Sequence, residues 1–163
     1  MTTCSLTEAG RVTSVARAVT CALVCLAGLP AVAHAALGDI APPAEAASPP
    51  AHSVAGGEAR MASYTDAAGT TVNVYIDARS RRIFAYTWQG PATPNLDTLL
   101  GPYAATWHSG AAALHAAGGD ELHAARVETP SVIVETGGHM RGYIGRAWLP
   151  GALPVGITER ALQ

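Results

Sequence analysis

Several residue types are scarce or absent in this sequence of 163 residues. It contains no lysine, because all ten basic residues are arginine, and we interpret this bias as codon usage rather than function. Phenylalanine occurs once, so the core must depend on Val, Leu, Ile, Tyr and Trp. The formal net charge of −2 argues against non-specific binding to nucleic acid or to an anionic membrane, and no nucleic-acid partner is expected.

Cysteine is confined to the N-terminal part of the chain, at Cys4, Cys21 and Cys25. The same part has the pattern of a secretory signal peptide: Arg11 and Arg17 precede an apolar run over 18–33, and residues 33–35 read Ala-His-Ala. We therefore expect cleavage after Ala35 and export to the periplasm or out of the cell. The mature chain would then contain no disulfide, thiolate nucleophile or cysteine metal site.

The rest of the chain divides into two segments by composition. Residues 36–57 are rich in Ala and Pro and have few large apolar side chains, so they predict a flexible tether. Residues 58–163 predict a single domain. No second long apolar run follows the signal peptide, so no transmembrane helix is expected in the mature protein.

Residues 60–88 predict a three-stranded antiparallel meander. Residues 71–76 alternate between apolar and polar side chains, and Asp77 and Ser80 favour a turn after them. Residues 83–88 alternate again, which would place Phe84, Tyr86 and Trp88 on one side of the strand.

A helical segment is predicted next. Thr93 can cap it, Pro94 suits its first turn, and Asp97 complements the helix dipole. Large apolar side chains then recur on one helical face, at Leu96, Leu99, Leu100, Tyr103 and Trp107. Because Gly101 and Pro102 interrupt this pattern, we expect a kink or a second short helix reaching about residue 117.

The C-terminal third predicts further strands over 122–128, 131–136 and 139–149, with Gly137 and Gly138 as a two-residue hairpin turn. The expected fold is therefore α+β: an antiparallel sheet of about five or six strands, in two hairpin or meander units, with a kinked helical segment packed on one face.

Short motifs along the mature chain occur in a combination that resembles a known family. They are ALG at 36–38, WQGP at 88–91, PNL at 94–96, LLG at 99–101, VETGGHMR at 134–141 and GRA at 145–147. Together they resemble a family of short exported bacterial proteins, catalogued as a domain of unknown function, number twenty-eight forty-four. The resemblance implies a single periplasmic or secreted domain with no assigned activity, cofactor or catalytic residue.

Two sets of polar residues are candidates for chemistry. His115, Glu121 and His123 could hold Zn, Cu or Ni if the fold brought them together, although surface or capping roles are the simpler interpretation. Glu135, His139 and Arg141 surround the expected hairpin turn, which would allow a cross-strand ion pair between Glu135 and Arg141. The catalytic alternative makes His139 a base and Arg141 an anion clamp, but no nucleophile accompanies them.

No cofactor motif is present, since the sequence has no phosphate loop, dinucleotide fingerprint or calcium loop. The leading functional hypothesis is a non-enzymatic envelope protein that binds another envelope protein or a small ligand. An exported hydrolase or metal-dependent enzyme, using either set of polar residues, is the first alternative. An assembly factor for a secretion or surface system is the second.

Overall fold

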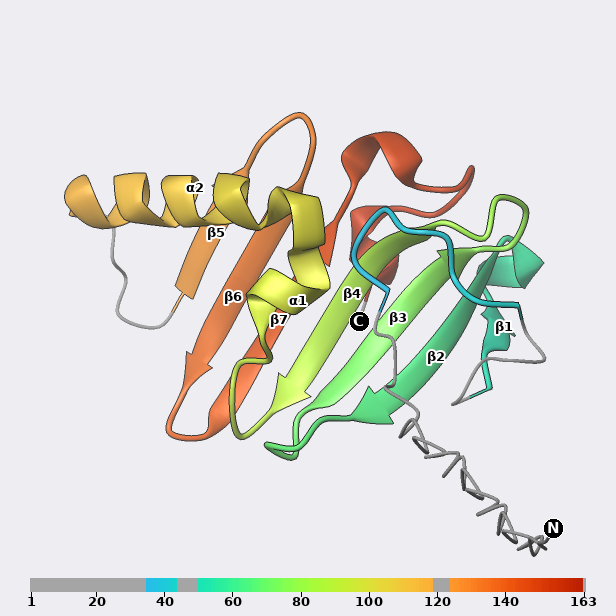
Figure 1. Ribbon diagram of the computed structural model, residues 1–163, viewed down its shortest axis with the longest axis horizontal. Coiled ribbons are helices and arrows are strands. Elements are labelled where there is room, and N and C mark those ends of the chain that lie inside the picture. Colours follow the sequence, from blue (N-terminus) through green and yellow to red (C-terminus); the bar gives the residue numbers. More distant parts are fainter. Residues whose placement is uncertain (1–34, 44–49, 119–123, 163) are drawn as a thin grey trace, which may run out of the picture. The chain divides into compact units, whose positions relative to one another are not determined.

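The computed structural model describes residues 35–43, 50–118 and 124–162, which belong to one structural unit, Val32–Gln163 (Figure 1). The predicted signal peptide lies outside the described residues, apart from Ala35 at its end. No helix in the described ranges is long and apolar enough to cross a membrane.

Seven strands form a single antiparallel sheet (Figure 1). They are β1 (His52–Val54), β2 (Ala59–Thr65), β3 (Thr71–Asp77), β4 (Ile83–Gly90), β5 (Ala124–Glu128), β6 (Ile133–His139) and β7 (Gly142–Trp148). Their order is β1-β2-β3-β4-β7-β6-β5, so the last three strands join the first four through β7. The α+β class is confirmed, and the sheet has more strands than the five or six predicted.

The helical segment consists of α1 (Leu96–Leu100), a 3-10 turn (Gly101–Tyr103) and α2 (Ala104–Ala116). Gly101 has φ of 53° and ψ of −116°, which confirms the predicted break. The cap differs from the prediction, because the side chain of Asn95, rather than Thr93, accepts a hydrogen bond of 3.0 Å from the backbone N–H of Thr98. Asp97 lies in the first turn as predicted.

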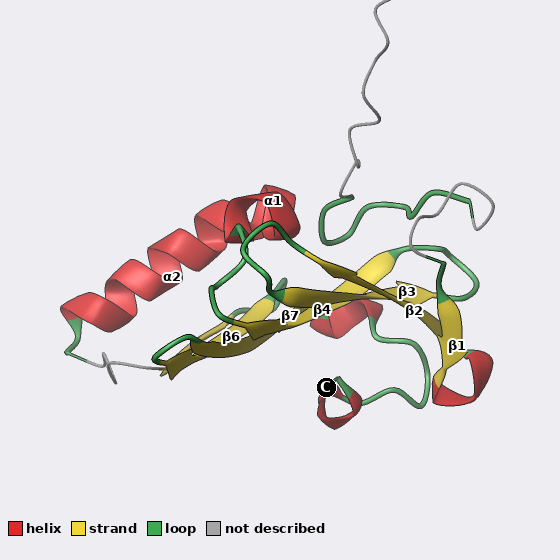
Figure 2. Ribbon diagram, turned by 90° about the horizontal axis from the view of Figure 1, so that it is seen from below, coloured by secondary structure: helices red, strands yellow, loops and turns green. Residues whose placement is uncertain are grey.

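The helices cover one face of the sheet, and the C-terminal segment lies on the other (Figure 2). On the helix side, Leu99, Leu100 and Trp107 pack in a core with side chains from the sheet, including Tyr86 and Trp88. Helix α2 comes close to β5 at Gly110, where an added Cβ would lie 2.4 Å from Cγ1 of Val127. On the opposite side, a smaller core forms around Tyr75, Phe84, Ile133, Trp148, Ile157 and Leu162.

The strand β4 departs from the predicted alternation at Phe84. Tyr75 pairs with Ala85 and Ile76 pairs with Ile83, so the register shifts and Phe84 is an extra residue on β4. A bulge of this kind turns the following side chains relative to the preceding ones. Phe84 therefore packs in the smaller core, whereas Tyr86 and Trp88 pack on the helix side. The prediction that the three share a face is wrong for Phe84 alone.

The segment expected to be a tether contributes to the domain at both of its ends. Leu37 and Ala41 are buried in the core on the helix side, and His52–Val54 forms the edge strand β1. Composition missed this because a single large apolar residue, Leu37, anchors the first part. Residues 44–49, in the middle of the expected tether, lie outside the described residues.

The hairpin turn between β6 and β7 lies later than predicted. His139 pairs with Gly142, so Met140 and Arg141 form the two-residue turn, with φ of 49° and 70°. Gly137 and Gly138 are instead paired within β6, opposite Ile144 and Tyr143. The two glycines have the backbone freedom that a turn requires, but the pairing of β6 with β7 continues past them.

Candidate ligand-binding site

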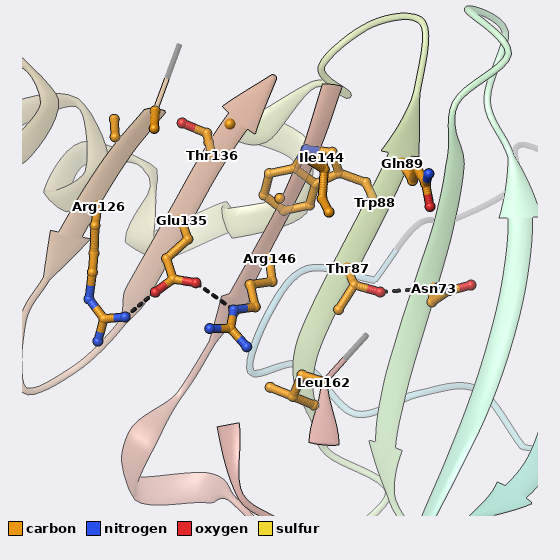
Figure 3. Close-up of a pocket in the computed structure, with 14 residues that line it drawn as sticks. Asn73, Thr87, Trp88, Gln89, Arg126, Glu135, Thr136, Ile144, Arg146 and Leu162 are labelled. Atoms are coloured by element: carbon orange, nitrogen blue, oxygen red, sulfur yellow. Dashed lines mark hydrogen bonds and ion pairs between the residues drawn. The ribbon is translucent and has the colours of Figure 1, made fainter. Parts of the chain in front are cut away.

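A pocket of about 800 Å³ opens among strands β3 to β7 (Figure 3). Most of its lining side chains alternate with residues of the helix-side core, which places them on the face that also carries the C-terminal segment. Its lining includes Asn73, Thr87, Trp88, Gln89, Arg126, Glu135, Ile144, Arg146 and Leu162.

A row of charged side chains crosses three strands on one side of the pocket. Glu135 on β6 is directly opposite Arg126 on β5 and Arg146 on β7. The Arg126 guanidinium donates to Oε1 of Glu135, and Nε of Arg146 donates to Oε2, as the dashed lines in Figure 3 mark. One carboxylate therefore bridges two arginines, and both of its oxygens are used.

Each arginine of this row has a further partner that fixes its position. Nε of Arg126 donates to Glu128 at 3.0 Å, and Nη1 of Arg146 donates to the carbonyl oxygen of Glu159 at 2.7 Å. The guanidinium carbons also lie over the buried ring of Trp148, at 5.7 Å for Arg126 and 5.0 Å for Arg146 from its centroid. An aromatic face attracts such cations, so the row is held from below as well as along its length.

The row determines the protonation of Glu135. Partial burial alone would raise the pKa of this carboxyl, but the hydrogen bond from Arg146 and the charges of both arginines outweigh that effect and hold the pKa below its ordinary value. Glu135 is therefore ionised at neutral pH. The pKa of Arg126 is raised, chiefly by its hydrogen bond to Glu128.

The other side of the pocket is less polar. Ile144 lies in the middle of β7 with 58% of its surface exposed, although β7 is a central strand. Gly145, next to it, leaves room for Trp88, because an added Cβ would lie 2.3 Å from Cζ2 of that ring. Nε1 of Trp88 is buried and has no hydrogen-bond partner in the described part of the chain.

Polar side chains on β4 and β3 continue the charged row, because Thr87 is directly opposite Arg146 and Asn73 is directly opposite Thr87. The amide nitrogen of Asn73 donates to the Thr87 hydroxyl at 3.1 Å, and the Asn73 oxygen accepts from Ser63 at 2.6 Å. These bonds hold Asn73 and Thr87 in place. The side chain of Gln89 is exposed and makes no hydrogen bond within the described residues, so its amide is available to a ligand.

The predicted catalytic residues do not form one cluster in the pairing of the strands. Glu135 lines the pocket, Arg141 lies exposed in the hairpin turn, and His139 is the last residue of β6, with its side chain outside the description. The expected ion pair between Glu135 and Arg141 is wrong, because the turn at 140–141 places Arg146 opposite Glu135. The error follows directly from placing the turn three residues too early.

The predicted metal set is only partly described. His115 is exposed in the last turn of α2, whereas Glu121 and His123 lie within 119–123, outside the described residues. Across the ranges that the structure does describe, no three His, Cys, Asp or Glu side chains are grouped so that they could hold a metal ion.

Several pocket residues were missed from the sequence, above all Arg126, Arg146 and Ile144. The sequence did contain a signal for the charged row, because Arg126 and Glu135 occupy matching positions on neighbouring predicted strands. A correct turn would have added Arg146 to the same row.

Comparison with known proteins identifies a family but no function. The family described as "Protein of unknown function (DUF2844)" matches residues 33–162, so the chain belongs to that family, as its motifs indicated. No curated protein and no solved structure matches the chain.

Proposed function

We propose that this family member is an exported binding protein that holds a small amphipathic molecule in the pocket over β3 to β7. Export is inferred from the signal-peptide pattern before Ala35. The observation that carries the binding role is the pocket itself, whose volume of about 800 Å³ lies within the range common for small-molecule sites.

The charged row that borders the pocket favours a ligand without net charge. The row Glu128–Arg126–Glu135–Arg146 contains two cations and two carboxylates, so their formal charges cancel. A strongly charged ligand would have to break ion pairs that are already satisfied, and leaving one partner unpaired is costly where the site is partly buried.

The distribution of polar and apolar groups favours an amphipathic ligand. Exposed Ile144 offers an apolar contact, and the free amide of Gln89, directly opposite it on β4, offers hydrogen bonds. Nη2 of Arg146 makes no hydrogen bond within the described residues and is a further donor. A neutral or zwitterionic molecule with one apolar side fits these groups.

The same residues favour binding over catalysis. A general base works best with a pKa near the operating pH, whereas the arginines lower the pKa of Glu135. Both arginines are committed to ion pairs, and no histidine is among the lining residues that the structure describes. Glu135 is thus held in its charged form rather than poised to exchange a proton with a substrate.

The test uses a fluorescent amphipathic probe and a pair of matched variants. N-phenyl-1-naphthylamine, an uncharged fluorophore at neutral pH, is titrated into the folded protein, with ligand-induced changes in tryptophan emission followed in parallel. Ile144→Glu places a charge in the pocket, whereas Val155→Glu makes the same change at a site that is 92% exposed and does not line the pocket.

We expect saturable binding to the wild-type chain, at least tenfold weaker binding to Ile144→Glu, and unchanged binding to Val155→Glu. Thermal unfolding of both variants shows whether they remain folded. Equal binding by the two variants, or no saturable binding of this probe or of a panel of neutral amphipathic molecules, would reject the pocket as the binding site.

A further inference from the structure

The residues that follow Ala35 are held firmly in place. Leu37 is fully buried in the core on the helix side. Its backbone N–H donates to the carbonyl oxygen of Leu99 at 2.8 Å, and that of Gly38 donates to Ile83 at 2.9 Å. Residues 37 and 38, which lie just after the bond where the sequence predicts signal cleavage, are therefore an integral part of the fold.

The peptide group between Ala35 and Ala36 is bound at both of its polar atoms. The Ala35 carbonyl oxygen accepts a hydrogen bond from the Tyr86 hydroxyl, and the Ala36 N–H donates to Oδ2 of Asp39 at 2.8 Å. The backbone N–H of Asp39 donates back to the Ala36 carbonyl at 3.0 Å, closing a short turn. The Asp39 carboxylate therefore binds the nitrogen of this peptide group, and the Tyr86 hydroxyl binds its carbonyl oxygen.

We infer that Ala36 becomes the N-terminal residue of the mature protein and that Asp39 and Tyr86 form a binding site for its α-ammonium group. This inference rests on the export part of the proposed function and is independent of the ligand pocket. A signal peptidase would hydrolyse the Ala35–Ala36 bond: water adds hydroxide to the carbonyl carbon of Ala35 and a proton to the nitrogen of Ala36. The new amine then takes up a second proton from solvent.

The geometry suits the charged product better than the intact chain. An ammonium group has three donors where the amide has one, and a charge-assisted hydrogen bond to a carboxylate has the same length as the 2.8 Å contact already present. The Tyr86 hydroxyl loses the Ala35 carbonyl on cleavage and is left beside the ammonium group. Burial raises the pKa of this hydroxyl, with smaller contributions from Tyr64 and Asp39, so it remains a neutral partner.

The absence of lysine makes the site directly measurable. All ten basic residues of the full sequence are arginine, so the α-amine is the only primary amine of the processed chain. An amine-reactive acylating reagent therefore reports on this group alone. The ordinary pKa of an α-amine is about 8, and an adjacent carboxylate raises it.

The experiment starts from the full chain expressed in a bacterium, with the protein recovered from the periplasm or the medium. N-terminal sequencing and intact mass identify the first residue, and acylation rates between pH 6 and 10 give the pKa of the amine. The comparison includes the native protein, the protein in denaturant, Asp39→Asn, and Glu128→Gln as a control at an exposed carboxylate on β5.

We expect Ala36 as the first residue and a single acylation site. At pH 7.5 the native amine should react about three- to tenfold more slowly than in Asp39→Asn or in denaturant, because a raised pKa leaves less free amine. Glu128→Gln should match the wild-type chain. The comparison with denaturant remains decisive even if Asp39→Asn fails to fold.

Other outcomes separate this inference from the proposed function. A chain that keeps Met1 would overturn both this inference and export. Processing at another bond, or an amine at Ala36 with the same reactivity in native and denatured protein, would overturn only the ammonium site. If the wild-type protein did not bind the probe but its Ala36 amine still reacted slowly, only the ligand pocket would be overturned.

Discussion

Glu135 and Arg146 lie directly opposite each other on β6 and β7, joined by a hydrogen bond from Nε of the arginine to Oε2 of the carboxylate. Arg126 contacts the other oxygen of Glu135 from β5. One side chain therefore ties together the three C-terminal strands on the open face of the sheet. The pH dependence of stability should show this role.

Replacing Glu135 by Gln removes the charge while keeping the shape. We expect a loss of about 1 kcal/mol in the free energy of unfolding at pH 7, since charge-assisted bonds of a half-buried group are worth somewhat more than surface ion pairs. Because the folded pKa of Glu135 is lower than its ordinary value of 4.5, this contribution is present above pH 4.5 and is lost as the pH falls through the folded pKa. Urea unfolding at pH 7 and pH 2.5 measures the difference.

The control for this variant is Glu128→Gln, which removes a carboxylate from the exposed end of the same row. Its side chain is 62% exposed, so we expect a loss of less than about 0.5 kcal/mol. If the two variants lost the same stability, or if the effect of Glu135→Gln did not shrink in acid, the row would not stabilise the sheet as described.

The sequence was sufficient to predict those features of the fold that depend on local periodicity. The alternation of residues 71–76 predicted the faces of β3, and the break at Gly101 predicted the division of the helical segment, both of which the structure confirms. Such patterns indicate which side of a helix or strand is buried. They can be recognised from residues that are close together in the sequence.

Features set by strand register could not be derived in the same way. Gly137 and Gly138 have the backbone freedom of turn residues, yet β6 continues through them and the chain turns at Met140 and Arg141. The pairing of whole strands outweighs the local preference for a turn. The same limitation concealed the charged row, because Glu135 meets Arg146 only in the correct register.

The turn at Met140 and Arg141 predicts a stabilising double substitution. Both residues have positive φ, a conformation that costs non-glycine residues about 1 kcal/mol or more each and that Asn-Gly adopts readily. We therefore expect Met140→Asn with Arg141→Gly to raise the free energy of unfolding by about 1 kcal/mol, measured by urea denaturation. Ala67→Asn with Ala68→Gly is the control, at a turn where neither residue has positive φ. An equal gain at both turns would contradict the explanation.

The close approach of Trp88 to β7 predicts that Gly145 cannot be enlarged. In Gly145→Ala the new Cβ would lie 2.3 Å from Cζ2 of Trp88 and 2.6 Å from the carbonyl oxygen of Glu135. Because the backbone on one side cannot yield easily, we expect a loss of about 2–3 kcal/mol and a change in tryptophan emission. Gly151→Ala is the control, since nothing lies within 4 Å of its added Cβ. A tolerated Gly145→Ala would show that Trp88 is free to move.

Leu37 provides the last test, which asks whether the first residues after the expected cleavage site belong to the domain. Its side chain is fully buried, so Leu37→Ala should cost about 2–4 kcal/mol of unfolding free energy through lost contacts and a new cavity. Ile40→Ala, three residues further along, removes a side chain that is 50% exposed and should cost less than about 1 kcal/mol. Thermal or urea unfolding of the processed chain distinguishes the two. Equal and small losses would mean that residues 36–41 behave as the tether their composition predicted, and the ammonium site beside Asp39 would then lose the anchor that positions it.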